Sequence, residues 1–216
     1  MKTQVDQRKT MKIESLSRKT DKLVRKCLDC GASMLGSPRS YIYKECGLKS
    51  VELLNVVVYE CQHCHETVPE IPAVDQLHAV IAINLLLKDS LLSGEEIRFL
   101  RKMASLTQAE LSEVLGVTPT RPSKWESNEE NIGAGTDRAL RACCLIAMAQ
   151  QHTTGEDPMP LMREIREFVR QMDVQEIFKG IRSKAEGPKQ VKIRHSGSTV
   201  EPWLLPVKGR LEQHVQ

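Results

Sequence analysis

The sequence predicts an α+β protein in which a small β-hairpin domain precedes a mainly helical domain. Two Cys-x-x-Cys pairs, at 27–30 and 61–64, enclose segments rich in β-forming residues. Further along, residues 91–126 have the pattern of three short helices joined by tight connections. A chain of 216 residues with 40% hydrophobic content can form one medium domain or two small ones. Since only 4% of the residues are aromatic, the cores must be mainly aliphatic.

Charge and cysteine content indicate which partners and which cellular compartment to expect. The net charge of +3 is a weak argument for nucleic acid, but basic residues are concentrated near both ends. Such arms either add salt-sensitive phosphate contacts or are solvated, disordered tails. The sequence has no apolar run long enough to span a membrane, and residues 1–26 lack a secretory signal's apolar region. We therefore expect a cytoplasmic protein whose seven cysteines are metal ligands or core residues rather than disulfides.

The two cysteine pairs predict a structural metal site. Each pair has two intervening residues, so one tight turn can direct both sulfurs at one ion. Four thiolates are typical of structural Zn²⁺, which a domain with little core of its own needs. Iron suits the same four sulfurs, because ligand type alone does not choose the metal. The expected ligands are Cys27, Cys30, Cys61 and Cys64.

The segment between the pairs predicts a β-hairpin. Residues 41–44 and 51–59 are rich in β-branched and aromatic residues, and the turn-prone Gly47 lies between them. Such a hairpin would bring the two cysteine pairs together. Four thiolates already complete a tetrahedral shell, so three nearby side chains are expected to be surface or bystander residues: His63, His65 and Cys46.

The stretch LLSGEEIRFLRKMASLTQAELSEVLGVTPTRPSKWE predicts a helix-turn-helix. Ser93 with Glu96, and Thr107 with Glu110, have the spacing of capping boxes, so helices are expected to begin there. Glycine at 116 is suited to end the second helix, and Thr118 with Pro119 would begin a third. In a helix-turn-helix the second helix of the motif enters the DNA major groove. The apolar stripe of the second predicted helix consists of Leu111, Val114 and Leu115.

Further helices are expected on both sides of this stretch. Residues 74–92 are apolar on more than one face, which suits a helix at a domain joint or a dimer seam. Thr136 is expected to cap a helix that closes the bundle and buries the thiols at 143 and 144. Another apolar face follows at 157–178. The tail is basic and carries one apolar island at 203–206, which either docks on a partner or packs on its own domain.

Together these motifs resemble the MqsA/YgiT-type family of two-domain proteins. The resemblance covers roughly residues 27–150 and rests on the double Cys-x-x-Cys hairpin, LLSGEEIRFLRKMASLTQAELSEVLGV and SKWE. It implies a zinc-binding N-terminal part and an XRE-type, lambda-repressor-like helix-turn-helix. Characterised members are antitoxins that bind a toxin, often an mRNA interferase, and repress their own operon as dimers. Many similar proteins are transcription regulators without a toxin.

The resemblance also implies individual roles. It places zinc at the four cysteines and a recognition helix at about 118–127, with Lys124 as the best base-edge candidate because lysine can donate to guanine O6 and N7. Trp125 is expected to pack beneath this helix, and Glu126 to have an intramolecular role because it would repel phosphate. The expected DNA contacts are Gln108, Thr118, Thr120, Arg121, Ser123 and Lys124, of which Gln108 and Ser123 would hold phosphate.

The sequence departs from the family pattern at two positions. His65 stands where the family usually has glycine, which affects the second cysteine turn but removes no ligand. Pro122 lies within the recognition helix, where its missing N–H and its effect on Arg121 predict a late start or a bend.

These observations predict a dimeric, zinc-stabilised, DNA-binding transcription regulator of the antitoxin type, with operator DNA and an mRNA-interferase-like toxin as partners. The sequence shows no nucleophile–base arrangement, so we do not expect an enzyme. One alternative is a protein-interaction module that sequesters a toxin or other partner and uses the helix-turn-helix for dimerisation. Another is an electron-transfer protein with iron at the four cysteines. The expected segments are a disordered basic arm at 1–26, a zinc-binding domain at 27–72, a helix-turn-helix domain at 73–150, and a C-terminal helix with basic tail at 151–216.

Overall fold

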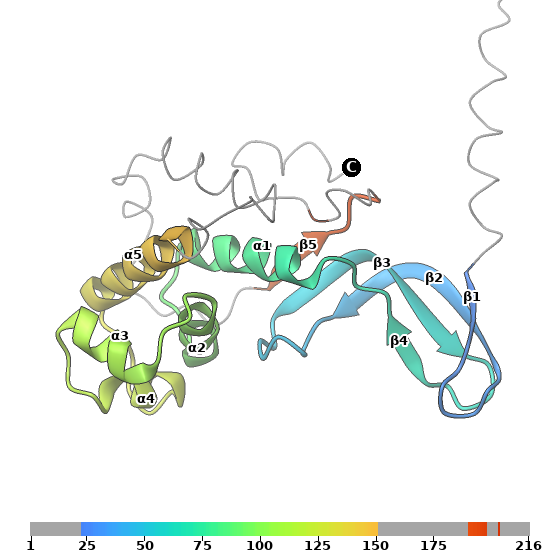
Figure 1. Ribbon diagram of the computed structural model, residues 1–216, viewed down its shortest axis with the longest axis horizontal. Helices are drawn as coiled ribbons and strands as arrows, with labels where there is room; N and C mark the ends of the chain where they lie inside the picture. Colours follow the sequence, from blue (N-terminus) through green and yellow to red (C-terminus); the bar gives the residue numbers. More distant parts are fainter. Residues whose placement is uncertain (1–22, 151–189, 198–202, 204–216) are drawn as a thin grey trace, which may run out of the picture. The chain divides into compact units, whose positions relative to one another are not determined.

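A computed structural model describes residues 23–150, 190–197 and 203 (Figure 1). The described chain is a mixed α+β structure, in which a mainly antiparallel sheet is followed by helices. The strands are β1 (Val24–Lys26), β2 (Ser33–Ile42), β3 (Val51–Cys61), β4 (Thr67–Pro69) and β5 (Val191–Arg194). The helices are α1 (Val74–Leu86), α2 (Gly94–Met103), α3 (Gln108–Leu115), α4 (Arg121–Glu126) and α5 (Ala134–Gln150).

The chain divides into two compact units. Of the described residues, the first unit contains those up to Arg39 together with Val56–Glu70. The second contains Ser40–Asn55 and those from Ile71 onward. The far end of the β2–β3 hairpin therefore belongs to the helical unit, although it lies inside the range expected for the zinc-binding domain.

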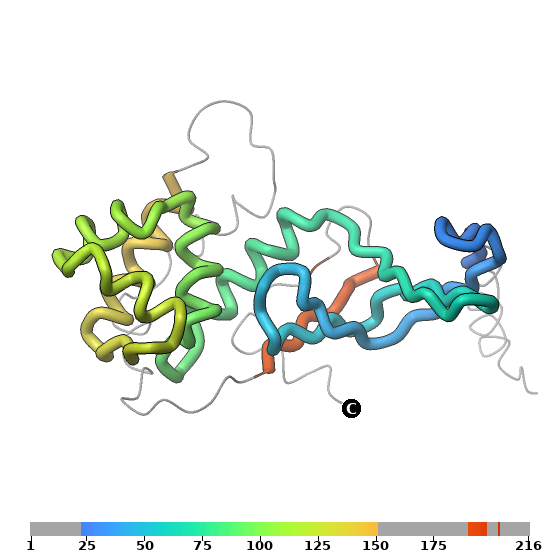
Figure 2. Tube along the Cα trace, turned by 90° about the horizontal axis from the view of Figure 1, so that it is seen from below, coloured from blue at the N-terminus to red at the C-terminus, as the bar shows by residue number. Residues whose placement is uncertain are grey.

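The sheet is built around the predicted hairpin. Its strands follow the order β1-β2-β3-β4, and β5 is also paired with β3. β4 runs antiparallel to the C-terminal part of β3, whereas β5 runs parallel to its N-terminal part. In Figures 1 and 2, β5 lies alongside β3 and α1. The hairpin expected between the two cysteine pairs is thus confirmed, but its first strand covers Ser33–Ile42 rather than residues 41–44.

The helical unit has an aliphatic core, as its composition requires. α2 packs on α1, α4 and α5, and α3 packs on α4 and α5. Both predicted capping boxes are present: the Ser93 and Thr107 side chains accept from the amides of Glu96 and Glu110, whose carboxylates accept in return. Gly116 ends α3 in the left-handed conformation (φ 63°). The fully buried aliphatic side chains of this core include Leu77, Ile81, Leu85, Ile97, Leu100, Leu111 and Leu140.

The third helix of the predicted stretch begins later than Thr118. Residues 118–120 form a turn in which the Arg121 amide donates to the Thr118 carbonyl (3.0 Å), and α4 begins at Arg121. Pro122 is the second residue of α4 and is buried. Its missing N–H falls in the first helical turn, where no carbonyl of the same helix would accept a hydrogen bond. The late start is therefore confirmed, and the proline does not interrupt the helix.

Other boundaries also differ from expectation. α1 ends at Leu86 rather than at residue 92, and α5 begins at Ala134, so Thr136 is not its cap. Val114 does not belong to the core, because 58% of it is exposed. β1 lies in the segment expected to be a disordered arm, and β5 lies in the basic tail, where no strand was expected. The helix expected at 157–178 lies outside the described residues.

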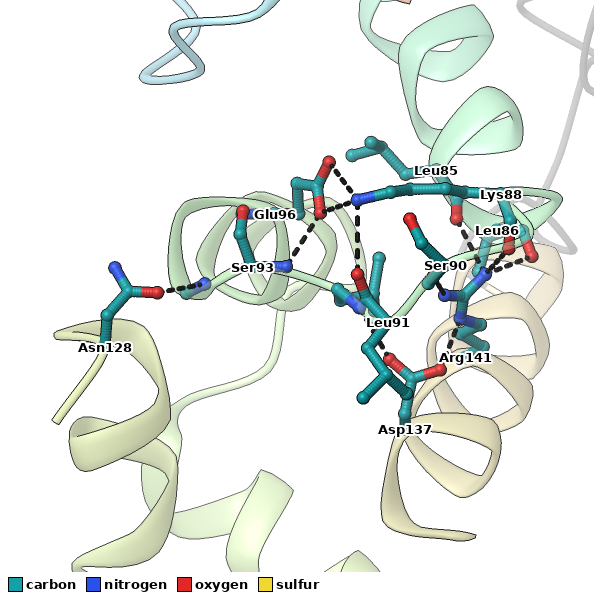
Figure 3. Close-up of polar contacts among 12 residues, drawn as sticks. Leu85, Leu86, Lys88, Ser90, Leu91, Ser93, Glu96, Asn128, Asp137 and Arg141 are labelled. Atoms are coloured by element: carbon teal, nitrogen blue, oxygen red, sulfur yellow. Dashed lines mark hydrogen bonds and ion pairs between the residues drawn. The ribbon is translucent and has the colours of Figure 1, made fainter. Parts of the chain in front are cut away.

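Two buried ion pairs fix the connection between α1 and α2 (Figure 3). The Asp137 carboxylate lies 2.8 Å from the Arg141 guanidinium, and both side chains are almost completely buried. Arg141 also donates to the carbonyls of residues 85, 86, 88 and 90, which closes the C-terminal end of α1. Lys88 pairs with Glu96 at 2.7 Å. Because each buried charge needs its partner, this connection has one well-defined arrangement.

Gly94 allows α2 to begin directly against the end of α4. A Cβ at this position would lie 2.7 Å from the Glu126 carbonyl oxygen and closer still to that of Trp125. The Gly94 amide donates to Asn128 Oδ1 at 2.9 Å (Figure 3). Both obstacles at this close approach are backbone atoms, which cannot rotate away as a flexible side chain would.

We predict that Gly94→Ala destabilises the helical unit by about 2–3 kcal/mol, because a methyl group must displace α4. Chemical denaturation followed by circular dichroism measures the change. Gly135→Ala, in the first turn of α5, is the matched control, because a Cβ there meets nothing within 4 Å. Equal stability of Gly94→Ala and Gly135→Ala would contradict this packing.

Candidate functional site

Four cysteine sulfurs form a candidate metal centre in the first unit. The Sγ atoms of Cys27, Cys30, Cys61 and Cys64 all lie within 4.8 Å of one another. Three of the Sγ–Sγ distances are 3.4–3.6 Å. Tetrahedral Zn²⁺ with bonds of about 2.3 Å would separate its sulfurs by about 3.8 Å. The donor set and its dimensions therefore fit one four-coordinate metal ion, as the sequence predicted.

The two cysteine turns share one backbone pattern. In each turn the amide of the first cysteine donates to the carbonyl five residues later, at 2.8 and 2.9 Å. The residue after the second cysteine is left-handed in both turns: Gly31 has φ 73° and His65 has φ 59°. Glycine adopts this conformation easily, whereas histidine is strained in it. His65 thus adopts the conformation that suits glycine, and its turn still brings Cys61 and Cys64 into the cluster.

Two backbone amides stabilise the thiolate form of Cys61. The amides of Cys64 and His63 donate to Cys61 Sγ at 3.5 and 3.4 Å. These two hydrogen bonds lower the pKa of the Cys61 thiol to about 6, so the thiolate is its main form at neutral pH. Thiolate is the form that binds metal.

Among the described residues, the other histidines and cysteines lie outside this cluster. The imidazoles of His63 and His65 are exposed, as expected. The Cys46 thiol donates to the Tyr43 carbonyl (3.3 Å) and is a bystander. In α5, Cys144 is buried as expected, whereas Cys143 is only half-buried.

Two of the candidate metal ligands are also part of the first unit's core. Cys27 and Cys61 are buried in one cluster with Met34 and Tyr59, and a few half-buried side chains pack against it. The Arg25 guanidinium covers the Tyr59 ring at 4.6 Å from its centroid. Because this core is so small, we expect a bound metal to supply much of the unit's cohesion.

We predict that the purified protein contains one zinc ion per chain and that Cys61→Ser loses most of it, because three thiolates cannot complete the closed shell. Inductively coupled plasma mass spectrometry gives the metal and its stoichiometry. Cys46→Ser, which changes a thiol outside the cluster, should retain the full metal content. Iron with a visible absorption band, or undiminished zinc in Cys61→Ser, would contradict the assignment.

A second candidate site is the outward face of α4 and the turn before it. The side chains of Thr118, Thr120, Arg121, Ser123 and Lys124 are all exposed. Arg121 also forms a surface ion pair with Glu130 (2.7 Å). The sixth predicted DNA contact, Gln108, is only half-exposed and donates to Glu126 Oε2 at 3.0 Å, a partner that the sequence did not indicate. The DNA contacts themselves stay predictions.

The opposite face of α4 is anchored by a buried carboxylate. Glu126 accepts hydrogen bonds from Arg101 at 2.6 and 3.0 Å, from Arg98 at 3.2 Å and from Gln108. Trp125 beside it is buried, as expected. Burial alone would raise the pKa of the Glu126 carboxyl, but the hydrogen bonds from Arg101 and Gln108 outweigh it and hold that pKa below its usual range. The intramolecular role expected for Glu126 is confirmed.

We predict that Glu126→Gln destabilises the helical unit by about 3 kcal/mol at pH 7, because it leaves the guanidinium of Arg101 without its anion. The folded-state pKa of Glu126 lies below that of the unfolded chain. Its stabilisation is therefore fully present above the ordinary glutamate pKa of about 4.3 and is lost as the pH falls through the folded-state value.

Denaturation of both proteins between pH 7 and pH 3 measures this effect. The stability difference between wild type and Glu126→Gln should shrink as the pH falls below about 4.3. Glu113→Gln, an exposed change on α3, controls for the loss of one negative charge. A difference that stays constant over the whole range would contradict the role of the Glu126 carboxylate.

Comparisons with known protein families, with curated proteins and with solved structures find no match to this chain. Among the described residues, no helix combines the length and the apolar character needed to cross a membrane.

Proposed function

We propose that the protein is a zinc-binding, sequence-specific DNA-binding transcription regulator of the antitoxin-like MqsA/YgiT type. It would act in the cytoplasm as a dimer and repress its own operon. In this proposal zinc is structural: its four thiolate ligands leave no position for a reactive water, and the protein is not an enzyme.

The two-sided character of α4 carries the proposal. Pro122, Trp125 and Glu126 face the protein interior, while Arg121, Ser123 and Lys124 are exposed. A short helix whose buried side packs on the protein, and whose exposed side carries basic and hydroxyl side chains, suits insertion into the major groove. Lysine can donate to guanine O6 and N7, and hydroxyl groups can hold phosphate. The turn ending α3 at Gly116 supports a helix-turn-helix made of α3 and α4.

In a dimer, two copies of α4 would occupy successive major grooves about one DNA turn apart. The target would then be a pseudo-palindrome upstream of the protein's own gene. The buried Glu126 network supports this reading, because it anchors α4 to α2 and α3 before DNA binds.

We predict that Lys124→Ala weakens binding to the operator by about 1–3 kcal/mol and reduces the preference for operator over random DNA. Gel-shift titrations on the upstream DNA, repeated at several salt concentrations, measure both quantities. Lys44→Ala, which removes an exposed lysine from the hairpin turn, is the matched control and should leave the preference unchanged. Equal losses on both DNAs would show that Lys124 contacts only phosphate.

A second candidate function is a protein-interaction module. Val24 and Leu35 lie opposite each other on β1 and β2, and both are exposed. Leu28, between the first two cysteines, is 92% exposed. Such apolar side chains favour a protein partner at the zinc-binding unit, for example an mRNA-interferase-like toxin. Absence of any gel shift at low salt would exclude the repressor and leave this function, with the helix-turn-helix serving dimerisation.

A further inference from the structure

A short segment near the C-terminus pairs with the sheet of the second unit. β5 runs parallel to β3, with Val191 beside Val51 and Arg194 beside Leu54. The Val191 amide donates to the Ser50 carbonyl at 2.7 Å, and the His195 amide donates to the Leu54 carbonyl at 3.0 Å. This segment lies alongside β3 and contacts α1 (Figures 1 and 2).

The side chains of β5 alternate in their surroundings. Ile193 is 2% exposed, whereas the flanking Lys192 and Arg194 are exposed. Lys192 Nζ lies 3.2 Å from a carboxylate oxygen of Glu52, its neighbour on β3. The strand thus contributes one apolar anchor and one ion pair in addition to its main-chain hydrogen bonds.

Trp203 provides a second anchor. The residue is 2% exposed, and its indole N–H donates to the Pro72 carbonyl at 2.8 Å. Its ring meets the His195 ring edge-to-face, with 5.2 Å between centroids. Pro72 lies just before α1, so the tail contacts both β3 and the start of this helix. Of the two alternatives for the apolar island, packing on the protein's own domain is confirmed for Trp203.

We propose that the β3 edge at Ser50–Asn55, together with the Pro72 carbonyl, is a docking site for an extended peptide strand, which residues 190–197 and Trp203 of this chain occupy as a separable strap. Its recognition elements follow the general logic of strand addition: main-chain hydrogen bonds give affinity, and side-chain anchors give specificity. This proposal does not depend on DNA binding.

The connectivity supports a separable strap. Parallel strands cannot be joined by a tight turn, and here the described helices α1–α5 and residues 151–189 lie between β3 and β5 in the sequence. The entropic cost of closing so long a connection changes little with its exact length. Among the described residues, the contacts of the strap with β3 and Pro72 come from 191–195 and Trp203. We expect this short stretch to bind without its covalent connection.

The site also defines which strand it accepts. The peptide must place an apolar side chain at the position of Ile193 and an indole at the Pro72 carbonyl. A cation one residue before the apolar anchor would meet Glu52, whose side chain is 15% exposed. Release of the strap would leave the β3 edge at Ser50–Leu54 without its strand partner, as at other exposed sheet edges.

The first test uses the full chain with a protease site inserted between residues 151 and 189. After cleavage, the C-terminal fragment should co-elute with the rest of the protein at high concentration and dissociate on dilution. Trp203→Ala should weaken the fragment's binding by about tenfold or more, because it removes a buried aromatic anchor. Arg194→Ala, an exposed change on the same strand, should alter binding by less than about threefold. A wild-type fragment that separates at every concentration would overturn the proposal.

The second test supplies the strap as a labelled peptide of residues 188–206. Fluorescence anisotropy should show binding to the full-length Ile193→Asp protein, whose own strap is weakened, and at least about tenfold weaker binding to wild type. Circular dichroism of the Ile193→Asp protein verifies that its helices are intact. If wild type and Ile193→Asp bind the peptide equally, the segment is not a separable strap. The same conclusion follows from the first test if the cleaved protein loses its helices when the fragment dissociates.

Discussion

The buried carboxylate of Glu126 determines what the helical unit can present to a partner. α4 has only six residues, too few to be a stable helix without tertiary contacts. Glu126 ties its last turn to two arginines of α2 and to Gln108 of α3. Trp125 and Pro122 are also buried, so the same side of α4 always faces the protein interior. The exposed position of Lys124 follows from this anchoring.

The two units have different sources of stability. The helical unit combines an aliphatic core with buried ion pairs at the connection between α1 and α2, as Figure 3 shows. Among its described residues, the first unit has a small cluster of buried side chains, two of which are themselves cysteines of the candidate metal centre. A bound metal would therefore act as core and cross-link at once. The repeated cysteine turns, one with Gly31 and one with His65, give the four sulfurs a common orientation.

The features predictable from the sequence are those whose causes are local. Two capping boxes, the glycine at the end of α3 and the cysteine cluster depend on residues a few positions apart or on a hairpin, and all are confirmed. Contacts between residues far apart in the sequence could not be predicted in this way. β5 is four residues long and pairs with residues about 140 positions earlier, so no local pattern indicated it. Gln108 has a polar side chain equally suited to phosphate or Glu126, and only the fold shows its internal partner.

The most direct test of the DNA-binding account is amide hydrogen exchange of the protein with and without its upstream DNA. Bound operator should slow exchange at the Arg121–Glu126 helix and in the turn before it, while the cysteine turns keep their rates. Protection confined to the first unit, or no protection at saturating DNA, would contradict recognition through α4.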